Sequence, residues 1–194
     1  MKKAAGILIL LGLAATLQAG VQSTISKQEK TIRISLVMTA NSCLGIGYLF
    51  NGTTPAGFDN PGFTQYVYYK SNIDLPRTVE EQYKAGKPVD PRNAKPGDLI
   101  FFYRDGDRKM IIDHVGIYLG KDKFMHMPGE GLRVAIDRIT KGNTYAKRFA
   151  AVRSYRHIFT VPDDGKRETR PEKTKPQQSA PEEESNQMFE TEDY

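Results

Sequence analysis

The 194-residue chain has very little cysteine, since Cys43 is its only one. A single thiol excludes an internal disulfide and a metal cluster built from cysteines. A chain of this length can fold around one hydrophobic core without such cross-links and still carry additional segments at its ends. We therefore expect one domain with a core of its own. We also expect no metal ion and no organic cofactor.

Long apolar runs are absent as well. Residues 4–17 carry no charge, but this run is shorter than the roughly 20 residues that a membrane span needs. Together with Lys2, Lys3 and the small residue Ala19, it is typical of an export signal, and an N-terminal membrane anchor is the alternative. No cysteine stands directly after the run, which argues against a bacterial lipid anchor.

These features predict a signal peptide at residues 1–19 and no stable membrane span after its cleavage. The protein would then be exported to the periplasm, the cell wall or the extracellular space.

Clusters of positive charge are also lacking. The whole chain has a net charge of +5, and residues 163–194 hold ten acidic and five basic residues, a net of −5. Without this tail and without the two positive charges of Lys2 and Lys3, residues 20–162 carry a net charge of +8. A basic domain suits an anionic cell envelope, with nucleic acid as the competing partner. Because the basic residues form no patch or arm, we expect no nucleic-acid binding.

The C-terminal tail, residues 161–194, is dominated by Lys, Glu, Pro, Gln and Ser, and has almost nothing apolar to bury. Such a composition predicts a disordered charged segment. We regard the tail as a candidate contact for an envelope protein.

The domain is expected at residues 31–160, after a polar leader at residues 20–30. From Ile32 to Cys43 apolar residues recur at spacings of three and four, which predicts a helix at residues 31–44. Cys43 falls on the buried stripe of this helix and is expected to be a small core residue. The alternative is a catalytic thiol, but Cys43 lacks the helix N-terminus that lowers a thiol pKa.

Two further helices are marked by capping residues. Asn60 is expected to be the N-cap of a helix at residues 61–71, with Pro61 as its first residue. Thr78 and Glu81 form a capping box for a short helix at residues 79–84, and a loop is expected at residues 87–95.

Five compact apolar runs then predict strands at residues 98–103, 111–119, 123–127, 132–136 and 149–155. Helices followed by an antiparallel meander of about five strands predict an α+β domain.

Several motifs occur in a fixed order from Ile32 to Arg156. They are Leu44-Gly45-Ile46-Gly47-Tyr48, residues 51–59, Leu75-Pro76-Arg77-Thr78 with Gln82, residues 96–102, residues 114–120, and Phe124-Met125-His126. In this order they resemble the NlpC-type family of cell-wall peptidases, papain-like cysteine hydrolases that cut peptidoglycan stem peptides. The resemblance implies a papain-like fold in which helices pack on an antiparallel sheet.

The resemblance fails at the nucleophile. Where the family has Asp-Cys-Ser-Gly, this chain has Asp59-Asn60-Pro61-Gly62. An amide side chain is not a useful nucleophile, and Pro61 removes a backbone N–H that could steady an oxyanion.

The resemblance assigns roles to four other residues. His114 matches the general base and His126 the residue that orients it, while Tyr48 and Asp59 match the substrate side. Asp59 would meet the free amine of a peptide, and core packing is an equal alternative for Tyr48. Arg77 and Gln82 are expected to brace the fold.

The two histidines can act together only if they share a face of the sheet. A three-residue loop at residues 120–122 would pair Leu119 with Lys123 and place both rings on one face, where Gly116 leaves room for a substrate backbone. A two-residue loop would place them on opposite faces.

Three hypotheses follow. The first is an exported, catalytically deficient NlpC-like domain that binds peptidoglycan stem peptides or regulates an envelope partner. The second is an active cysteine-type endopeptidase that cleaves γ-D-glutamyl–diamino acid bonds and uses Cys43 or an unrecognised nucleophile. The third is a structural envelope protein with an empty cleft.

Overall fold

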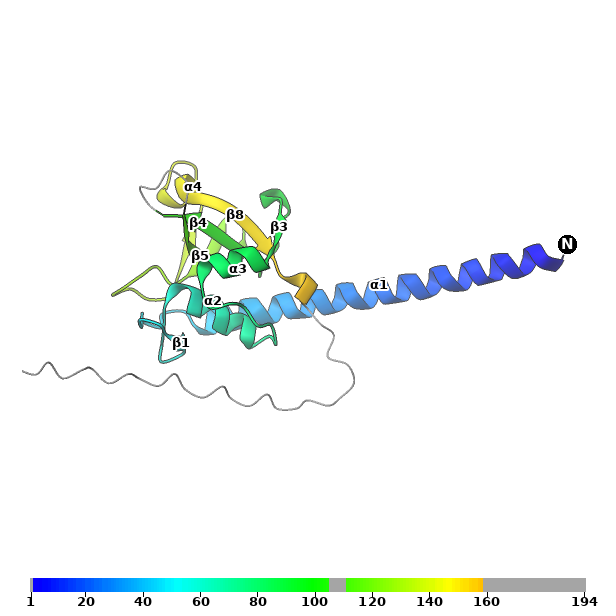
Figure 1. The fold of residues 1–194 in the computed structure, drawn as a ribbon, viewed down its shortest axis with the longest axis horizontal. Coiled ribbons are helices and arrows are strands. Elements are labelled where there is room, and N and C mark those ends of the chain that lie inside the picture. Colours follow the sequence, from blue (N-terminus) through cyan, green and yellow to red (C-terminus); the bar gives the residue numbers. More distant parts are fainter. Residues whose placement is uncertain (1, 105–110, 159–194) are drawn as a thin grey trace, which may run out of the picture. The chain divides into compact units, whose positions relative to one another are not determined.

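The computed structural model describes residues 2–104 and 111–158 (Figure 1). The predicted tail at residues 161–194 lies outside the described residues, so its disorder stays a prediction. The first helix, α1, runs without a break over Lys2–Ser42 and includes the predicted leader, so it begins earlier than the expected helix. Within the described part of the chain, no helix is both long and apolar enough to cross a membrane. Cleavage after Ala19 stays a prediction.

The C-terminal third of α1 supplies one wall of the main core. Leu36 and Ala40 are buried there, and Cys43, the first residue after the helix, is buried with them, all at 0 to 1% exposure. The spacing of four and three keeps Cys43 in line with the buried face of the helix. The expected burial of Cys43 is therefore confirmed, although the helix ends one residue before it.

A six-stranded antiparallel sheet forms the centre of the domain, in the order β3-β8-β4-β5-β6-β7. Its strands are β3 (Lys87–Val89), β4 (Leu99–Tyr103), β5 (Ile112–Gly120), β6 (Lys123–His126), β7 (Ala135–Arg138) and β8 (Phe149–Ser154). A separate hairpin pairs β1 (Thr53–Thr54) with β2 (Gly57–Phe58). The expected loop at residues 87–95 contains the missed strand β3, which tolerates Pro88 because it lies at the edge of the sheet.

The two faces of the sheet carry different clusters. On one face Val115 and Ile117 belong to the main core with Phe63 and Val67 of α2 (Asn60–Tyr69) and Val79 of α3 (Val79–Ala85). The other face has a smaller cluster that includes Phe102 and Phe124, with Tyr145 of α4 (Thr144–Arg148) packed against it. Side chains on a strand alternate, so His114 and His126 belong to this second face.

The cap of α2 differs from the prediction. Asp59, not Asn60, is the N-cap: its backbone is extended, and its carboxylate accepts a hydrogen bond from the backbone N–H of Gly62 at 2.7 Å. Both residue types are good N-caps, so the local sequence does not distinguish them. Asn60 is the first helical residue, and its side chain turns toward the sheet. The capping box of Thr78 and Glu81 at α3 is confirmed.

The turn between β5 and β6 gives the expected register by another route. Its loop is two residues long, Lys121 and Asp122, both with positive φ (51° and 59°) as a type I′ turn requires. An irregularity between Tyr118 and Gly120 adds one residue to β5, and beyond it Ile117 pairs with Met125. The bulge offsets the shorter loop, so the two histidines share a face.

Candidate functional site

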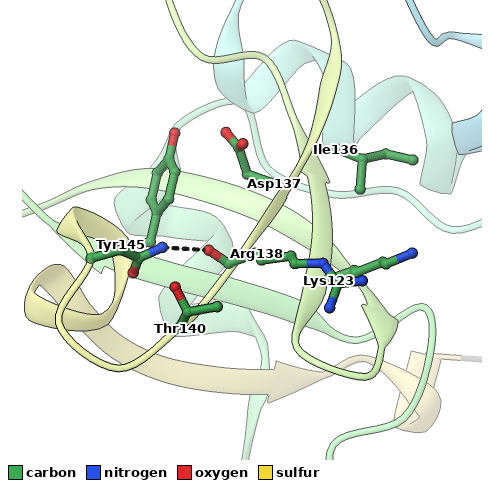
Figure 2. A pocket seen from close by; sticks show the side chains of 7 residues that line it. Lys123, Ile136, Asp137, Arg138, Thr140 and Tyr145 are labelled. Atoms are coloured by element: carbon green, nitrogen blue, oxygen red, sulfur yellow. Dashed lines mark hydrogen bonds between the residues drawn. The ribbon is translucent and has the colours of Figure 1, made fainter.

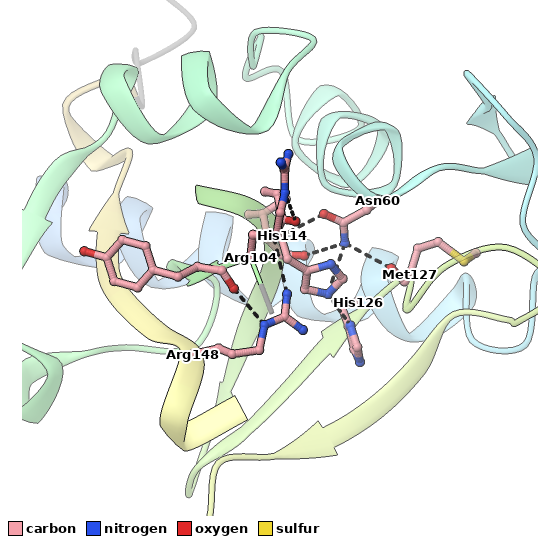
Figure 3. A network of polar contacts seen from close by, with 9 residues as sticks. Asn60, Arg104, His114, His126, Met127 and Arg148 are labelled. Carbon is pink, nitrogen blue, oxygen red and sulfur yellow. Dashed lines mark hydrogen bonds and ion pairs between the residues drawn. The ribbon is translucent and has the colours of Figure 1, made fainter. Parts of the chain in front are cut away.

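The side chain of Asn60 completes the end of the β5–β6 ladder. Its Oδ1 accepts from the N–H of Val115 at 2.9 Å, and its Nδ2 donates to the carbonyls of Val115 at 2.8 Å and Met127 at 3.0 Å (Figure 3). β6 ends at His126, so it does not extend far enough to pair with Val115. The Asn60 amide provides the hydrogen bonds to Val115 that a longer β6 would provide. Both N–H groups of the amide therefore have carbonyl partners.

The two histidines form a chain of hydrogen bonds that ends at a carboxylate. His114 Nε2 lies 2.7 Å from His126 Nδ1, and His126 Nε2 lies 2.9 Å from Asp137 Oδ2. A carboxylate only accepts, so His126 carries its hydrogen on Nε2. In the neutral ring Nδ1 then accepts, and His114 donates to it from Nε2. The rings are nearly perpendicular, with centroids 4.9 Å apart.

Asp137 and Tyr145 are members of this network that the sequence did not indicate. The Tyr145 hydroxyl lies 3.4 Å from His126 Nε2, and its ring packs edge-on against the imidazole. Asp137 belongs to a strand expected at residues 132–136 and found at Ala135–Arg138. Because the expected strand ended before Asp137, the sequence did not predict that the Asp137 carboxylate lies beside His126.

Burial controls the charge of the histidine pair. Burial lowers the pKa of His114 to about 3, helped by His126 and by the nearby Arg148 guanidinium. Burial also lowers the pKa of His126, against the opposing effect of Asp137. Arg148 is held in place by the carbonyl of Tyr103 at 2.7 Å and by Asp113 at 3.3 Å. Both imidazoles are therefore neutral at neutral pH.

This depressed pKa makes stability depend on pH. The unfolded chain, with a His pKa near 6.5, binds a proton more readily than the folded chain between pH 6.5 and about 3. The contribution of neutral His114 to the free energy of unfolding is therefore fully present above pH 6.5. It is lost as the pH falls toward 3, by up to about 1.4 kcal/mol per pH unit. We expect the free energy of unfolding in urea to fall across this window, and less steeply in His114→Gln. An NMR titration in which His114 protonates near pH 6.5 would contradict this prediction.

Asp59 is already engaged within the chain. One carboxylate oxygen caps α2 at Gly62, and the other accepts from the guanidinium of Arg77. A carboxylate offers about four acceptor positions, so an amine can still bind, although Arg77 balances much of the charge. The predicted contact with a substrate amine stays a prediction.

Tyr48 lies next to this region. Its backbone bridges to Phe58, the residue before Asp59, and its half-buried ring packs against the main core. The structure thus supports the core-packing alternative for Tyr48 and leaves its substrate contact a prediction.

The sequence suggested that Gly116 leaves room for a substrate backbone, but the structure shows that it does not. A Cβ there would lie 2.7 Å from the Phe124 ring and 3.0 Å from the Met125 carbonyl. Glycine is needed for the close packing of β5 on β6.

Gln82 braces the fold, as predicted. It is fully buried, binds Thr64, and donates to the carbonyls of Pro61 and Pro76.

Cys43 lies in the core, not beside the histidines. Burial raises the pKa of its thiol, so little thiolate is present at neutral pH. We expect thiol reagents to label the folded protein slowly. Cys43→Ala should lower the free energy of unfolding by about 1 kcal/mol. Rapid labelling at neutral pH, prevented by a stem peptide, would instead identify Cys43 as a nucleophile.

The described side chains offer two neutral imidazoles and a carboxylate next to an amide that has no nucleophilic lone pair. They can move a proton between His114 and Asp137, whereas the Asn60 amide is not a useful nucleophile. Among the described residues, no group of three or more His, Cys, Asp and Glu side chains is placed to hold a metal ion.

Known proteins are similar to this chain in sequence. The chain is similar to the gamma-DL-glutamyl hydrolase of Bacillus subtilis (strain 168), 42% identical over 92 residues, which cover 47% of this chain and 22% of that protein. It is 37% identical over 127 residues to the gamma-D-glutamyl-L-lysine dipeptidyl-peptidase of the same organism, covering 65% and 42%. The chain thus spans less than half the length of these two relatives.

The fold agrees with these similarities. An NlpC/P60 family protein from Bacillus cereus ATCC 10987 has a TM-score of 0.59 and 32% identity, over 63% of this chain and 40% of that one. The predicted α+β NlpC-type fold is thereby confirmed. The model of the NlpC/P60 family matches residues 45–154, more than half of the sequence. The chain therefore belongs to the NlpC/P60 family.

Proposed function

We propose that this protein is an exported NlpC/P60 domain that binds peptidoglycan stem peptides without cleaving them. The observation that carries this proposal is the use of Asn60. At the start of α2, where the family has its thiol, the amide hydrogen bonds to Val115 and Met127 as part of the fold. A side chain committed in this way is a structural group.

A second feature supports the loss of chemistry. Pro61 follows Asn60 and has no backbone N–H, so the first turn of α2 lacks one donor for an oxyanion. The carbonyl of Pro61 is occupied by Gln82 and Thr64. The start of the helix is thus well braced and poorly equipped for catalysis.

Binding is supported by what remains. The pair of His114 and His126 is intact and hydrogen-bonded to Asp137, and Asp59 keeps acceptor positions for an amine. The two Bacillus subtilis relatives are named for γ-glutamyl bonds, which indicates stem peptides as ligands. Such ligands lie outside the cytoplasm, in agreement with the predicted signal peptide.

The test is incubation of the purified protein with peptidoglycan fragments, followed by mass spectrometry of bound and released species. We expect retained stem peptides and no γ-D-glutamyl dipeptide above the level of an Asn60→Ala control. Release of the dipeptide above that control would identify a working enzyme, and absence of any bound peptide would leave a purely structural role.

A further inference from the structure

An open hollow of about 520 Å³ lies at the edge of the sheet beyond Asp137 (Figure 2). It is lined by Lys123, Ile136, Asp137, Arg138, Thr140, Asn143 and Tyr145. β7 is the last strand of the sheet, and three of the lining residues are consecutive in it. Because successive side chains of a strand point to opposite faces, the hollow extends over the edge of the sheet.

Two cations lie directly opposite each other in this hollow. Lys123 of β6 is the cross-strand partner of Arg138 of β7, and Figure 2 shows both side chains extending from the same part of the sheet. Neither forms an ion pair with any residue that the structure describes. Like charges directly opposite each other on a sheet destabilise the fold. A bound anion would offset the repulsion between these two cations.

The remaining lining suits a group that accepts hydrogen bonds. Thr140 and Tyr145 contribute hydroxyls, and the amide of Asn143 is fixed by its bond to the carbonyl of Arg138 at 2.8 Å. The one anion in the lining, Asp137, has its Oδ2 on His126 Nε2. Two cations against one engaged carboxylate leave the hollow with a net positive charge.

We propose that this hollow binds a carboxylate group of a peptide, held by Lys123 and Arg138. The identity of the peptide rests on the proposed function, since a γ-linked D-glutamyl residue keeps its α-carboxylate free. Binding here is sensed by the histidine pair, because Asp137 lines the hollow and is hydrogen-bonded to His126.

The experiment is an NMR titration of the full-length protein with L-alanyl-γ-D-glutamyl-L-lysine, with the same peptide in which both carboxylates are amides as the matched ligand. We expect the carboxylate peptide to shift the amides of Arg138 and Thr140 and the ring of His126. Lys123→Gln and Arg138→Gln should each weaken its binding by roughly 10-fold, the loss expected for one charge-assisted hydrogen bond. The amidated peptide should leave the hollow unshifted.

Two controls separate the hollow from the rest of the site. Lys87→Gln removes the same charge from β3, at the opposite edge of the sheet, and should not change binding. Removing one of two like charges should leave the melting temperature unchanged or higher, which excludes misfolding as the cause of weaker binding. Peptide binding that ignores both Lys123→Gln and Arg138→Gln would overturn this inference while the proposed function stands.

A third ligand tests the hollow when the stem peptide does not bind. N-acetyl-D-glutamate carries two carboxylates and is not a stem peptide. Shifts at Arg138 and Thr140 with this ligand alone would support the carboxylate site while the proposed function fails. No shift with either ligand would overturn the site as well.

Discussion

Asn60→Ala should lower the free energy of unfolding by about 3 kcal/mol. The substitution removes the partners of the Val115 N–H, the Val115 carbonyl and the Met127 carbonyl. A backbone group left without a partner costs about 1–3 kcal/mol when buried, and water entering beside this half-buried side chain reduces the sum. Urea unfolding monitored by circular dichroism measures the loss.

Asn60→Asp separates hydrogen bonding from packing. The carboxylate has the shape of the amide but places an oxygen where Nδ2 now faces two carbonyl oxygens. We expect a loss at neutral pH at least as large as that of Asn60→Ala. The matched control is Asn93→Ala, at an exposed position, with a change within about 0.5 kcal/mol. If Asn60→Ala behaved like this control, the amide would not be holding the end of the ladder.

The sequence predicted most of the fold because local patterns specify it. The apolar stripe through Leu36 and Cys43, the capping box at Thr78 and the run of compact strands all depend on neighbours in the chain. β3 was missed because it is three residues long, contains Pro88 and exists only through its pairing with β8. Its formation depends on tertiary structure.

The histidine register shows how a correct conclusion can rest on an incorrect detail. The shared face of His114 and His126 was predicted from a three-residue loop, but the loop has two residues and a bulge in β5 supplies the third. Lys121 and Asp122 are not the usual residues of such a turn, so the sequence gives no sign of positive φ there. A bulge depends on strand pairing and has no local signature.

The candidate site was predicted only in part, because the sequence does not show which residues its side chains form hydrogen bonds with. Asn60 and Asp59 are both good N-caps, and the choice between them is made by Val115, more than fifty residues away. Asp137 and Tyr145 reach His126 from β7 and α4, elements whose bounds the apolar pattern did not mark. Long-range hydrogen bonds of this kind are decided by the fold.

Asn60→Cys with Pro61→Ser should give the domain measurable hydrolysis of a γ-D-glutamyl-L-lysine bond. A thiol at the start of α2 gains from the positive end of the helix, and the neutral His114 ring lies beside it, with Nε2 3.4 Å from Asn60 Nδ2. Since Nε2 carries the hydrogen that it donates to His126, Nδ1 is the ring nitrogen that can accept the thiol proton. Serine at position 61 restores the missing backbone N–H as an oxyanion donor. The expected rate is at least roughly 100-fold above that of Asn60→Ala with Pro61→Ser, since a positioned base alone contributes this much.

Three measurements make this gain of activity decisive. His114→Ala in the cysteine background should abolish the added hydrolysis, because the thiol then has no base. Alkylation should be fast at position 60 and slow at buried Cys43, so labelling reports whether the new thiol is exposed and reactive. The variant loses the hydrogen bonds of the Asn60 side chain and is therefore less stable. The assay is run at a temperature where circular dichroism shows the variant folded. A folded variant whose thiol at position 60 is alkylated rapidly but cleaves nothing would show that the domain has lost more of its catalytic machinery than the nucleophile.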